Sequence, residues 1–548
     1  MAWYDEAVFY HIYPLGLSGA PAQNAYEAPV HRLRELHPWI DHMSRMGFTA
    51  LYIGPLFESV GHGYETTDYY KVDSRLGTNE DLKEFVSRCH EKGIRVILDG
   101  VFNHTGRDFF AFKDVREHRE NSPYKDWYCH VDFWGNTEYN DGFSYENWGG
   151  YNLLARLNQR NPQVVEYILQ VIRFWVSEFA IDGLRLDAAD VLDFDFMRAL
   201  RRLANEVKPD FWLMGEVIHG EYSRWVNPQM LHAVTDYALH KALYSGHNDH
   251  NYFEIAHTVK RTMDMLPGGT RLYNFVDNHD VERIISKLHN RAHYLPVHVL
   301  LFTLPGIPSV YYGSELGLEG RKEWGSDASL RPYIDPAVCR NADTDNPYAR
   351  LISKLAHLHG SCPDLVRGDY RPLHLTTGQF SFARGSVIVA VNNEDRDASF
   401  SVEGSGVYKG ILSGTEHTAS DGRLQIELPP CQAEIFLPVS QEDSQAGTAP
   451  ESRKAQDGPL FDFSVKSSAS EDAENGLGTA KESAEESTEP EETVIPDGLS
   501  YQEMSVEQLQ AVILQKMSRN GPVTDQMRRE VRQNIWRDSL INWANSFR

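Results

Sequence analysis

In the segment Gly183-Leu184-Arg185-Leu186-Asp187, an arginine and an aspartate stand at the carboxyl end of an apolar, β-rich run. Three other apolar runs end in a similar way. They lead into Asp99-Gly100-Val101-Phe102-Asn103-His104, Gly215-Glu216-Val217 and Phe275-Val276-Asp277-Asn278-His279-Asp280. Acids and histidines at the carboxyl ends of successive strands are typical of the active site of a (β/α)8 barrel. The four segments therefore predict an α/β fold built on such a barrel.

Strands and helices alternate around these segments, as a barrel requires. Thr78 has the residue type of a helix N-cap, and Gly93 ends the helix that follows it. Asn161-Pro162 combines a cap with a proline at the first helical position. The predicted strands include residues 8–13, 49–53, 233–237, 272–276 and 307–312, and the predicted helices include 31–46, 79–92 and 162–179.

Two segments depart from this alternation. Residues 105–158, after the third strand, are rich in Trp, Tyr, Asn and Gly. Residues 366–440 contain short β-rich runs separated by turn signals, which predict a small antiparallel β domain. The barrel is therefore assigned to residues 1–104 and 159–365.

The C-terminal part of the chain has a different composition. Residues 441–497 hold fifteen Asp and Glu against four Lys and Arg and are rich in Ser, Ala, Gly and Thr, which predicts a disordered acidic linker. Ser505-Val506-Glu507-Gln508 has the pattern of a capping box and predicts a helix to residue 517. A second helix is predicted after Asn520-Gly521-Pro522. Residues 498–548 are interpreted as a small helical module that packs on itself, with docking to a protein partner, self-association or an anionic surface as the alternative.

Composition narrows the class of protein. The formal net charge of −25 argues against nonspecific nucleic-acid binding, which needs a basic surface. The N-terminus has no basic region followed by a long apolar run, so we expect neither export nor a membrane span. Five scattered cysteines, an odd number, suggest reduced thiols in a cytoplasmic protein.

The order and spacing of the four segments resemble the α-amylase superfamily of retaining α-glucoside hydrolases and transglycosylases. Residues 88–99 and Gly215-Glu216-Val217-Ile218-His219 are most similar to its cyclomaltodextrinase, neopullulanase and maltogenic amylase branch. The resemblance implies that residues 105–158 form the inserted B domain and that residues 366–440 form the C-terminal β-sandwich domain. Leu154-Ala155-Arg156-Leu157-Asn158 departs from the usual form of that branch, which leaves α-1,4 against α-1,6 preference open.

The resemblance also implies roles for three carboxyl groups. A retaining hydrolase needs a carboxylate nucleophile and a carboxylic acid that later acts as a base. Asp187 matches the nucleophile, Glu216 the general acid/base, and Asp280 the third carboxylate, which binds sugar hydroxyls. Arg185 stands two residues before Asp187, so both side chains point to the same face and Arg185 can hold Asp187 ionised.

Further matches concern sugar binding. His104 and His279 match the two histidines that hydrogen-bond the sugar, and Tyr64 matches the aromatic platform beneath it. Asp99 and Asn103 are expected to support the barrel mouth without touching substrate. A lone acid or histidine at a strand end is usually structural, but the full set makes that explanation improbable.

No cofactor is required by this chemistry. Many members of the superfamily bind calcium through an asparagine matching Asn103 and a histidine shortly after the nucleophile. Here Ala188-Ala189-Asp190-Val191 follows Asp187, so that histidine is missing. Hard cations need several oxygen ligands. A structural calcium site is therefore not favoured, and no metal ligand is assigned.

Three functions are compatible with these motifs. The leading hypothesis is hydrolysis of short α-glucans such as maltodextrins or cyclodextrins. A transglycosylase or an isomerising enzyme similar to trehalose synthase would use the same residues, because both share the covalent intermediate. A noncatalytic glucan-binding scaffold ranks far behind, since all three carboxylates are present.

Overall fold

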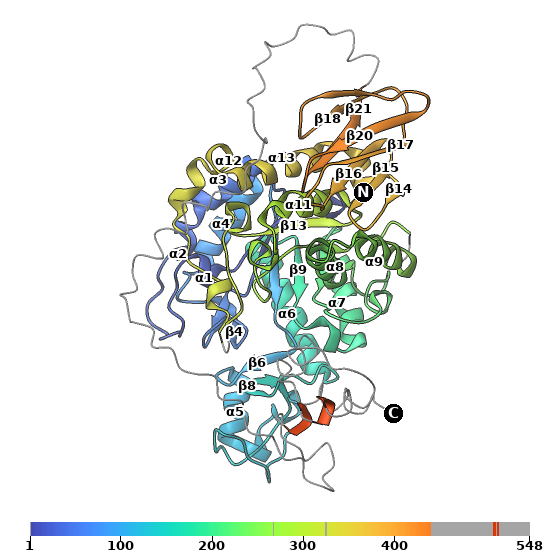
Figure 1. Cartoon of the computed structure of the whole chain (residues 1–548). Helices are drawn as coiled ribbons and strands as arrows, with labels where there is room; N and C mark the ends of the chain where they lie inside the picture. Colours follow the sequence, from blue (N-terminus) through green and yellow to red (C-terminus); the bar gives the residue numbers. More distant parts are fainter. Residues whose placement is uncertain (1, 267, 324–325, 440–507, 511, 515–548) are drawn as a thin grey trace, which may run out of the picture. The chain divides into compact units, whose positions relative to one another are not determined.

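The computed structural model describes residues 2–266, 268–323, 326–439, 508–510 and 512–514 (Figure 1). Its centre is a sheet of eight parallel strands in the order β11-β10-β9-β5-β2-β1-β13-β12. A parallel bridge between Thr235, which follows β11, and Tyr273 in β12 joins the two ends of this order. The predicted (β/α)8 barrel is therefore confirmed.

The barrel strands are short and, apart from Arg95 at the start of β5, buried. They are β1 (Phe9–Ile12), β2 (Ala50–Ile53), β5 (Arg95–Gly100), β9 (Gly183–Leu186), β10 (Trp212–Gly215), β11 (Ala233–Val234), β12 (Tyr273–Asn274) and β13 (Ile307–Tyr311). Parallel strands covered on both faces are expected to be almost continuously apolar, as these are. Eight short strands ending at one mouth bring together side chains that are far apart in the sequence.

Helices surround this sheet (Figure 1). Those following successive strands include α3 (His37–Met46), α4 (Asn79–Glu91), α6 (Pro162–Phe179), α7 (Phe194–Val207), α8 (Tyr237–Asn248), α9 (Tyr252–Met265), α11 (Tyr294–Thr303) and α13 (Pro347–Ser361). Thr78 caps α4 in a capping box with Asp81, and Asn161 caps α6 by accepting from the backbone N–H of Gln163. Local capping chemistry thus fixes where these two helices begin.

Several predicted elements were too long, among them the strand expected over 272–276, which is limited to β12. The helix expected over 31–46 is divided into α2 (Arg32–Glu35) and α3, because Pro38 lacks a backbone N–H and its ring opposes a continuous helix. The strand expected over 233–237 ends at Val234. Asp236 instead accepts a hydrogen bond from the backbone N–H of Leu239 (2.9 Å) and caps α8.

Two smaller β structures accompany the barrel. After β5, strands β6 (His104–Gly106), β7 (Asn147–Trp148) and β8 (Tyr151–Arg156) form an antiparallel sheet beside α5 (Phe110–His118). The C-terminal part contains β14 (Tyr370–Leu375), β15 (Gln379–Arg384), β16 (Val387–Asn392), β18 (Val407–Gly410), β19 (Glu416–Thr418) and β21 (Ala433–Pro438) in one antiparallel sheet, with β17 (Ala398–Glu403) and β20 (Arg423–Leu428) in another. An apolar cluster that includes Ile388, Val402 and Ile426 packs between these sheets.

A second compact unit spans Leu477–Arg548. Residues 508–510 and 512–514 in it are helical, within the helix predicted to reach residue 517. The predicted acidic linker and the predicted second helix lie outside the described residues. No described helix is both long and apolar enough to cross a lipid bilayer.

Candidate active site

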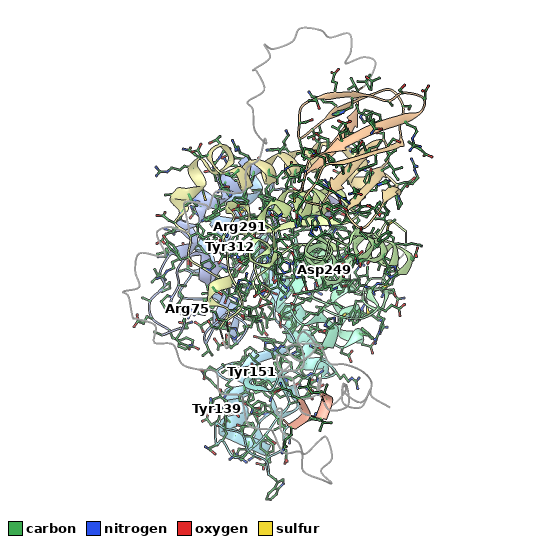
Figure 2. The ribbon with its side chains drawn as sticks, viewed as in Figure 1. Arg75, Tyr139, Tyr151, Asp249, Arg291 and Tyr312 are labelled. Atoms are coloured by element: carbon green, nitrogen blue, oxygen red, sulfur yellow. The ribbon has the colours of Figure 1, made fainter. Side chains whose placement is uncertain are left out.

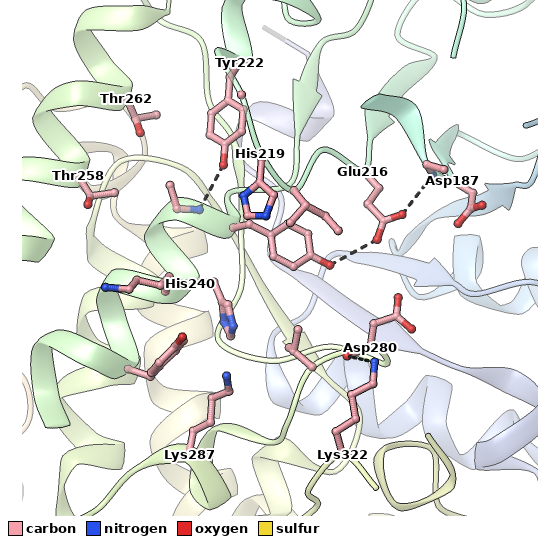
Figure 3. Close-up of a pocket in the computed structure, with 18 of the residues that line it drawn as sticks. Asp187, Glu216, His219, Tyr222, His240, Thr258, Thr262, Asp280, Lys287 and Lys322 are labelled. Carbon is pink, nitrogen blue, oxygen red and sulfur yellow. Dashed lines mark hydrogen bonds between the residues drawn. The ribbon is translucent and has the colours of Figure 1, made fainter. Parts of the chain in front are cut away.

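A cleft of about 1010 Å³ opens at the carboxyl ends of the barrel strands (Figure 3). Asp187 follows β9, Glu216 follows β10, and Asp280 lies in the segment after β12. The cleft is lined by these three carboxyl groups together with Tyr64 and His104. The strand-end segments that the sequence singled out therefore converge on one cavity.

Side chains fill the barrel region of the molecule (Figure 2). Within it, one buried guanidinium, that of Arg185, connects the acidic groups. Nη1 of Arg185 donates to Oδ1 of Asp187 (2.8 Å) and to Oδ1 of Asp99 (2.9 Å). Nη2 lies 2.8 Å from Oε2 of Glu216. Because a guanidinium is planar and carries several donors at fixed angles, it sets the relative positions of these carboxyl groups.

Glu216 has two further polar neighbours at the cleft. The backbone N–H of Ala188 donates to its Oε2 (3.2 Å), and the hydroxyl of Tyr237 donates to its Oε1 (3.4 Å) (Figure 3). Ala188 adopts a left-handed conformation with φ of 45°. This turn directly after Asp187 aims an amide at the neighbouring acid.

The electrostatics favour retention of a proton at this cluster. Burial raises the pKa of Asp187, Arg185 opposes that rise, and the nearby Glu216 and Asp99 carboxylates add to it. One guanidinium cannot neutralise three ionised carboxylates in a site of low polarity. The crowding of acids thus opposes ionisation of Asp187, and the hydrogen bond from Arg185 is the contact that favours its charged form.

Asp280 has a different environment. Its Oδ1 accepts from Nη2 of Arg331 (2.8 Å), and its Oδ2 lies 3.0 Å from Nε2 of His279. Burial alone would raise the pKa of Asp280, but His279 and Arg331 outweigh it and lower the pKa below the usual range. Asp280 is therefore ionised in the folded protein near neutral pH.

The two histidines and the tyrosine predicted to bind sugar lie close together. The Tyr64 hydroxyl lies 2.5 Å from Nε2 of His279 and donates to Oδ2 of Asp99 (3.2 Å). Nδ2 of Asn103 donates to Nδ1 of His104 (3.2 Å), and Nε2 of His104 donates to the carbonyl of Tyr64 (3.1 Å). Burial lowers the pKa of His104 to about 3, so its ring is neutral.

The two residues predicted as supporting are deeply buried. Asp99 accepts from Arg185, Tyr64 and the hydroxyl of Tyr52 (2.8 Å), and neither it nor Asn103 is among the residues that line the cleft. Oδ1 of Asn103 has no hydrogen-bond partner within the described residues. In the same part of the chain, no cluster of three or more Asp, Glu, His or Cys side chains is arranged to hold a metal ion.

Sequence reasoning missed Arg331 and Tyr237. Arg331 follows a 3-10 turn over Ala328–Leu330 and reaches Asp280 from a loop, so no strand-end pattern identifies it. Tyr237 was assigned to a strand but is the first residue of α8. The cap residue Asp236 immediately before it was the available signal.

The sequence that forms this cleft is similar to proteins of a known family. Residues 33–348, more than half of the chain, match the family described as alpha amylase, catalytic domain. The chain belongs to the α-amylase family. A cyclomaltodextrinase from a Bacillus species is 31% identical over 445 residues, which cover 76% of this chain and 77% of the relative.

This α-amylase-family chain is also similar to two other proteins. Neopullulanase 2 of Thermoactinomyces vulgaris is 29% identical over 466 residues, which cover 79% of this chain and 78% of that protein. The native form of a Nostoc punctiforme debranching enzyme is similar with a TM-score of 0.69 at 26% identity, and the match covers 79% of this chain and 98% of that structure. The predicted resemblance is confirmed: the chain is an α-amylase-family glycosidase similar to cyclomaltodextrinase and neopullulanase.

Proposed function

We propose that this glycosidase cleaves α-glucosidic bonds, mainly α-1,4, in maltodextrins, cyclodextrins or related short α-glucans, with retention of anomeric configuration. The observation that carries the proposal is the attachment of Asp187 and Glu216 to one guanidinium at the floor of a cleft. The names of the relatives support the substrate class, since they describe enzymes of cyclomaltodextrins, of pullulan and of branched glucans.

The mechanism assigns each carboxyl group one role. Asp187 attacks the anomeric carbon and forms a glycosyl-enzyme ester, while Glu216 gives its proton to the departing oxygen. Glu216 then removes a proton from water, which releases the sugar from Asp187. Asp280, held ionised by Arg331 and His279, binds hydroxyls of the same sugar and favours its distorted transition state.

The neighbouring residues position these groups. Arg185 favours the ionised form of Asp187, because its Nη1 donates to Oδ1 of that carboxylate. Tyr64, His104 and His279 contact the sugar that is cleaved. Since two carboxyl groups suffice for this reaction, the proposal requires no cofactor and assigns no metal.

A product profile tests the proposal. Maltose, maltotriose, maltoheptaose, β-cyclodextrin and pullulan are each incubated with the full chain, and the anomer released first is recorded by NMR. We expect glucose or maltose as the α-anomer, and loss of at least 10³-fold in kcat for Asp187→Asn. Asp195→Asn, at an exposed carboxylate on α7, is the matched control.

Three outcomes would contradict the proposal. Release of the β-anomer would exclude retention. Full activity of Asp187→Asn would exclude the assigned nucleophile. Disproportionated or isomerised sugars without net hydrolysis would instead identify a transglycosylase.

A further inference from the structure

The cleft continues beyond the catalytic carboxyl groups and over α8 and α9. This part, which we call the basic arm, is lined by His219, Lys241, His257, Arg261 and Lys287. The chain as a whole carries a formal charge of −25. Basic side chains gathered in the cleft of an acidic protein are not explained by solubility and indicate a role in binding.

Lys241 accounts for part of this charge by pairing within the arm. Its ammonium forms an ion pair with Glu254, whose other oxygen accepts from the hydroxyl of Ser245 (2.9 Å). Lys287 and Arg261 form no ion pair with any described carboxylate. Glu282 acts on Lys287 and Asp236 on Arg261 only through longer-range charge interactions. Two full positive charges in the arm are therefore left without a direct counter-ion.

Lys287 is partly withdrawn from water. Its ammonium lies 4.0 Å from the centre of the Tyr244 ring, and burial lowers its pKa from the ordinary value. A cation in such a place costs free energy unless an opposite charge approaches it. An anion bound beside Lys287 would offset this cost, so the electrostatics of the free site favour anion binding.

His240 adds a second observation. It lies beside Lys287 in the cleft (Figure 3), is 4% exposed, and has its Nδ1 buried without a hydrogen-bond partner among the described residues. The ring stacks on Phe275 at 5.0 Å, and burial followed by the charge of Lys287 lowers its pKa to about 3. The other ring nitrogen donates to the backbone of Val276, so Nδ1 of the neutral ring is an acceptor that can take a hydrogen bond from a hydroxyl of the sugar that bears the anion.

We propose that the basic arm binds an anionic group, a phosphate or a carboxylate, carried by the leaving group of the α-glucoside. The proposal rests on the proposed function, because the arm adjoins Glu216, which protonates the leaving oxygen. A neutral glucan needs no unpaired Lys287 or Arg261 in its path. An anionic leaving group would pair with both while the glucose to be cleaved occupies the site of Tyr64 and His279.

Matched substrate pairs test this proposal. Maltose is compared with maltose phosphorylated at O6 of its reducing glucose, and α-glucosylglycerol with α-glucosylglycerate. We expect kcat/KM to be at least tenfold higher for one anionic member than for its neutral partner. The pair that shows the higher kcat/KM for its anionic member tells whether the arm binds a phosphate or a carboxylate. Lys287→Gln should lower that ratio at least fivefold, and so should Arg261→Gln, which changes an exposed residue of α9 and carries less risk to folding.

The control is Lys83→Gln, which removes the same charge from an exposed residue of α4 paired with Glu178 (3.1 Å). It should leave the ratio unchanged. Equal kcat/KM within both pairs, with maltodextrins cleaved, would overturn the proposal and leave the proposed function standing.

If no substrate is cleaved, the proposed function fails, and binding tests the arm by itself. Calorimetry then compares glucose 6-phosphate with glucose on the full chain and on Lys287→Gln. If glucose 6-phosphate binds more tightly than glucose to the full chain, and this difference disappears in Lys287→Gln, the proposed anion site in the basic arm is supported. Equal binding of the two sugars overturns it.

Discussion

Replacing Arg185 with lysine keeps a positive charge at the barrel mouth and removes the planar group that spans the carboxylates. The guanidinium uses two nitrogens to reach Asp99, Asp187 and Glu216 at 2.8–2.9 Å. A lysine ammonium is a single nitrogen on a flexible stem and cannot occupy both positions. It can retain contact with one or two of the carboxylates, while the others lose a fixed partner.

The size of the effect follows from the lost hydrogen bonds. A hydrogen bond to a charged group contributes about 1.5–3 kcal/mol, so losing two costs about 3–6 kcal/mol. Only the part expressed in the transition state reduces the rate, and each 1.4 kcal/mol or so corresponds to tenfold. We expect Arg185→Lys to lower kcat/KM by roughly 10²–10⁴-fold. The loss should fall mainly on kcat, because the residue acts on the reacting carboxylates.

The assay is the initial rate of maltoheptaose hydrolysis as a function of substrate concentration and pH, with the melting temperature as a check on folding. Arg173→Lys is the matched control, since Arg173 forms a two-point ion pair with Glu206 (2.7 and 3.0 Å) on the exposed surface of α6. A folded Arg185→Lys enzyme with kcat/KM within tenfold of the parent would refute the assigned positioning role.

Three further predictions use other contacts. Arg331→Gln removes a partner that lowers the pKa of Asp280, so that pKa, followed by NMR titration of the carboxyl carbon, should rise, and an unchanged pKa would contradict the assigned contact. Asp182 has its pKa lowered to about 2, since donors from neighbouring basic groups outweigh burial. Its stabilisation of about 2 kcal/mol is present above pH 4 or so and is lost as pH falls towards 2. Asp182→Asn should therefore lower the free energy of urea unfolding at pH 7 far more than at pH 2. Gly183→Ala would place a Cβ 2.5 Å from the carbonyl oxygen of Trp212 and should cost about 1–3 kcal/mol, seen as a lower melting temperature.

The meeting of the three candidate carboxyl groups in one cleft was predictable because a strand end is a local feature. Arg185 and Asp187 are two residues apart, so an extended backbone directs both side chains to one face. The parallel order of β5, β9 and β10 then brings their carboxyl ends to one mouth. Sequence pattern and topology together specify which side chains meet, without any knowledge of loops.

The parts that escaped prediction depend on loops and on competition between local structures. Arg331 and Asp280 are separated by 51 positions that include β13, but neither residue lies in a strand, and only the packed loop after β13 brings them together. Residues 233–237 have β-rich composition, but the capping hydrogen bond of Asp236 ends the strand in favour of α8. Propensity describes one segment, whereas a cap or a loop contact depends on the chain around it.

The three carboxyl groups of the cleft belong to two residue types yet have three different environments, and those differences determine their roles. Burial and the neighbouring acids raise the pKa of Asp187, and Arg185 is the one fixed partner that opposes this rise. Glu216 shares that guanidinium but also contacts the amide of Ala188 and the hydroxyl of Tyr237 at the cleft. Asp280 has its own arginine and histidine and stays ionised. The shared guanidinium thus holds Asp187 and Glu216 as a pair, whereas Asp280 depends on a separate arginine and histidine, in keeping with the separate role proposed for it.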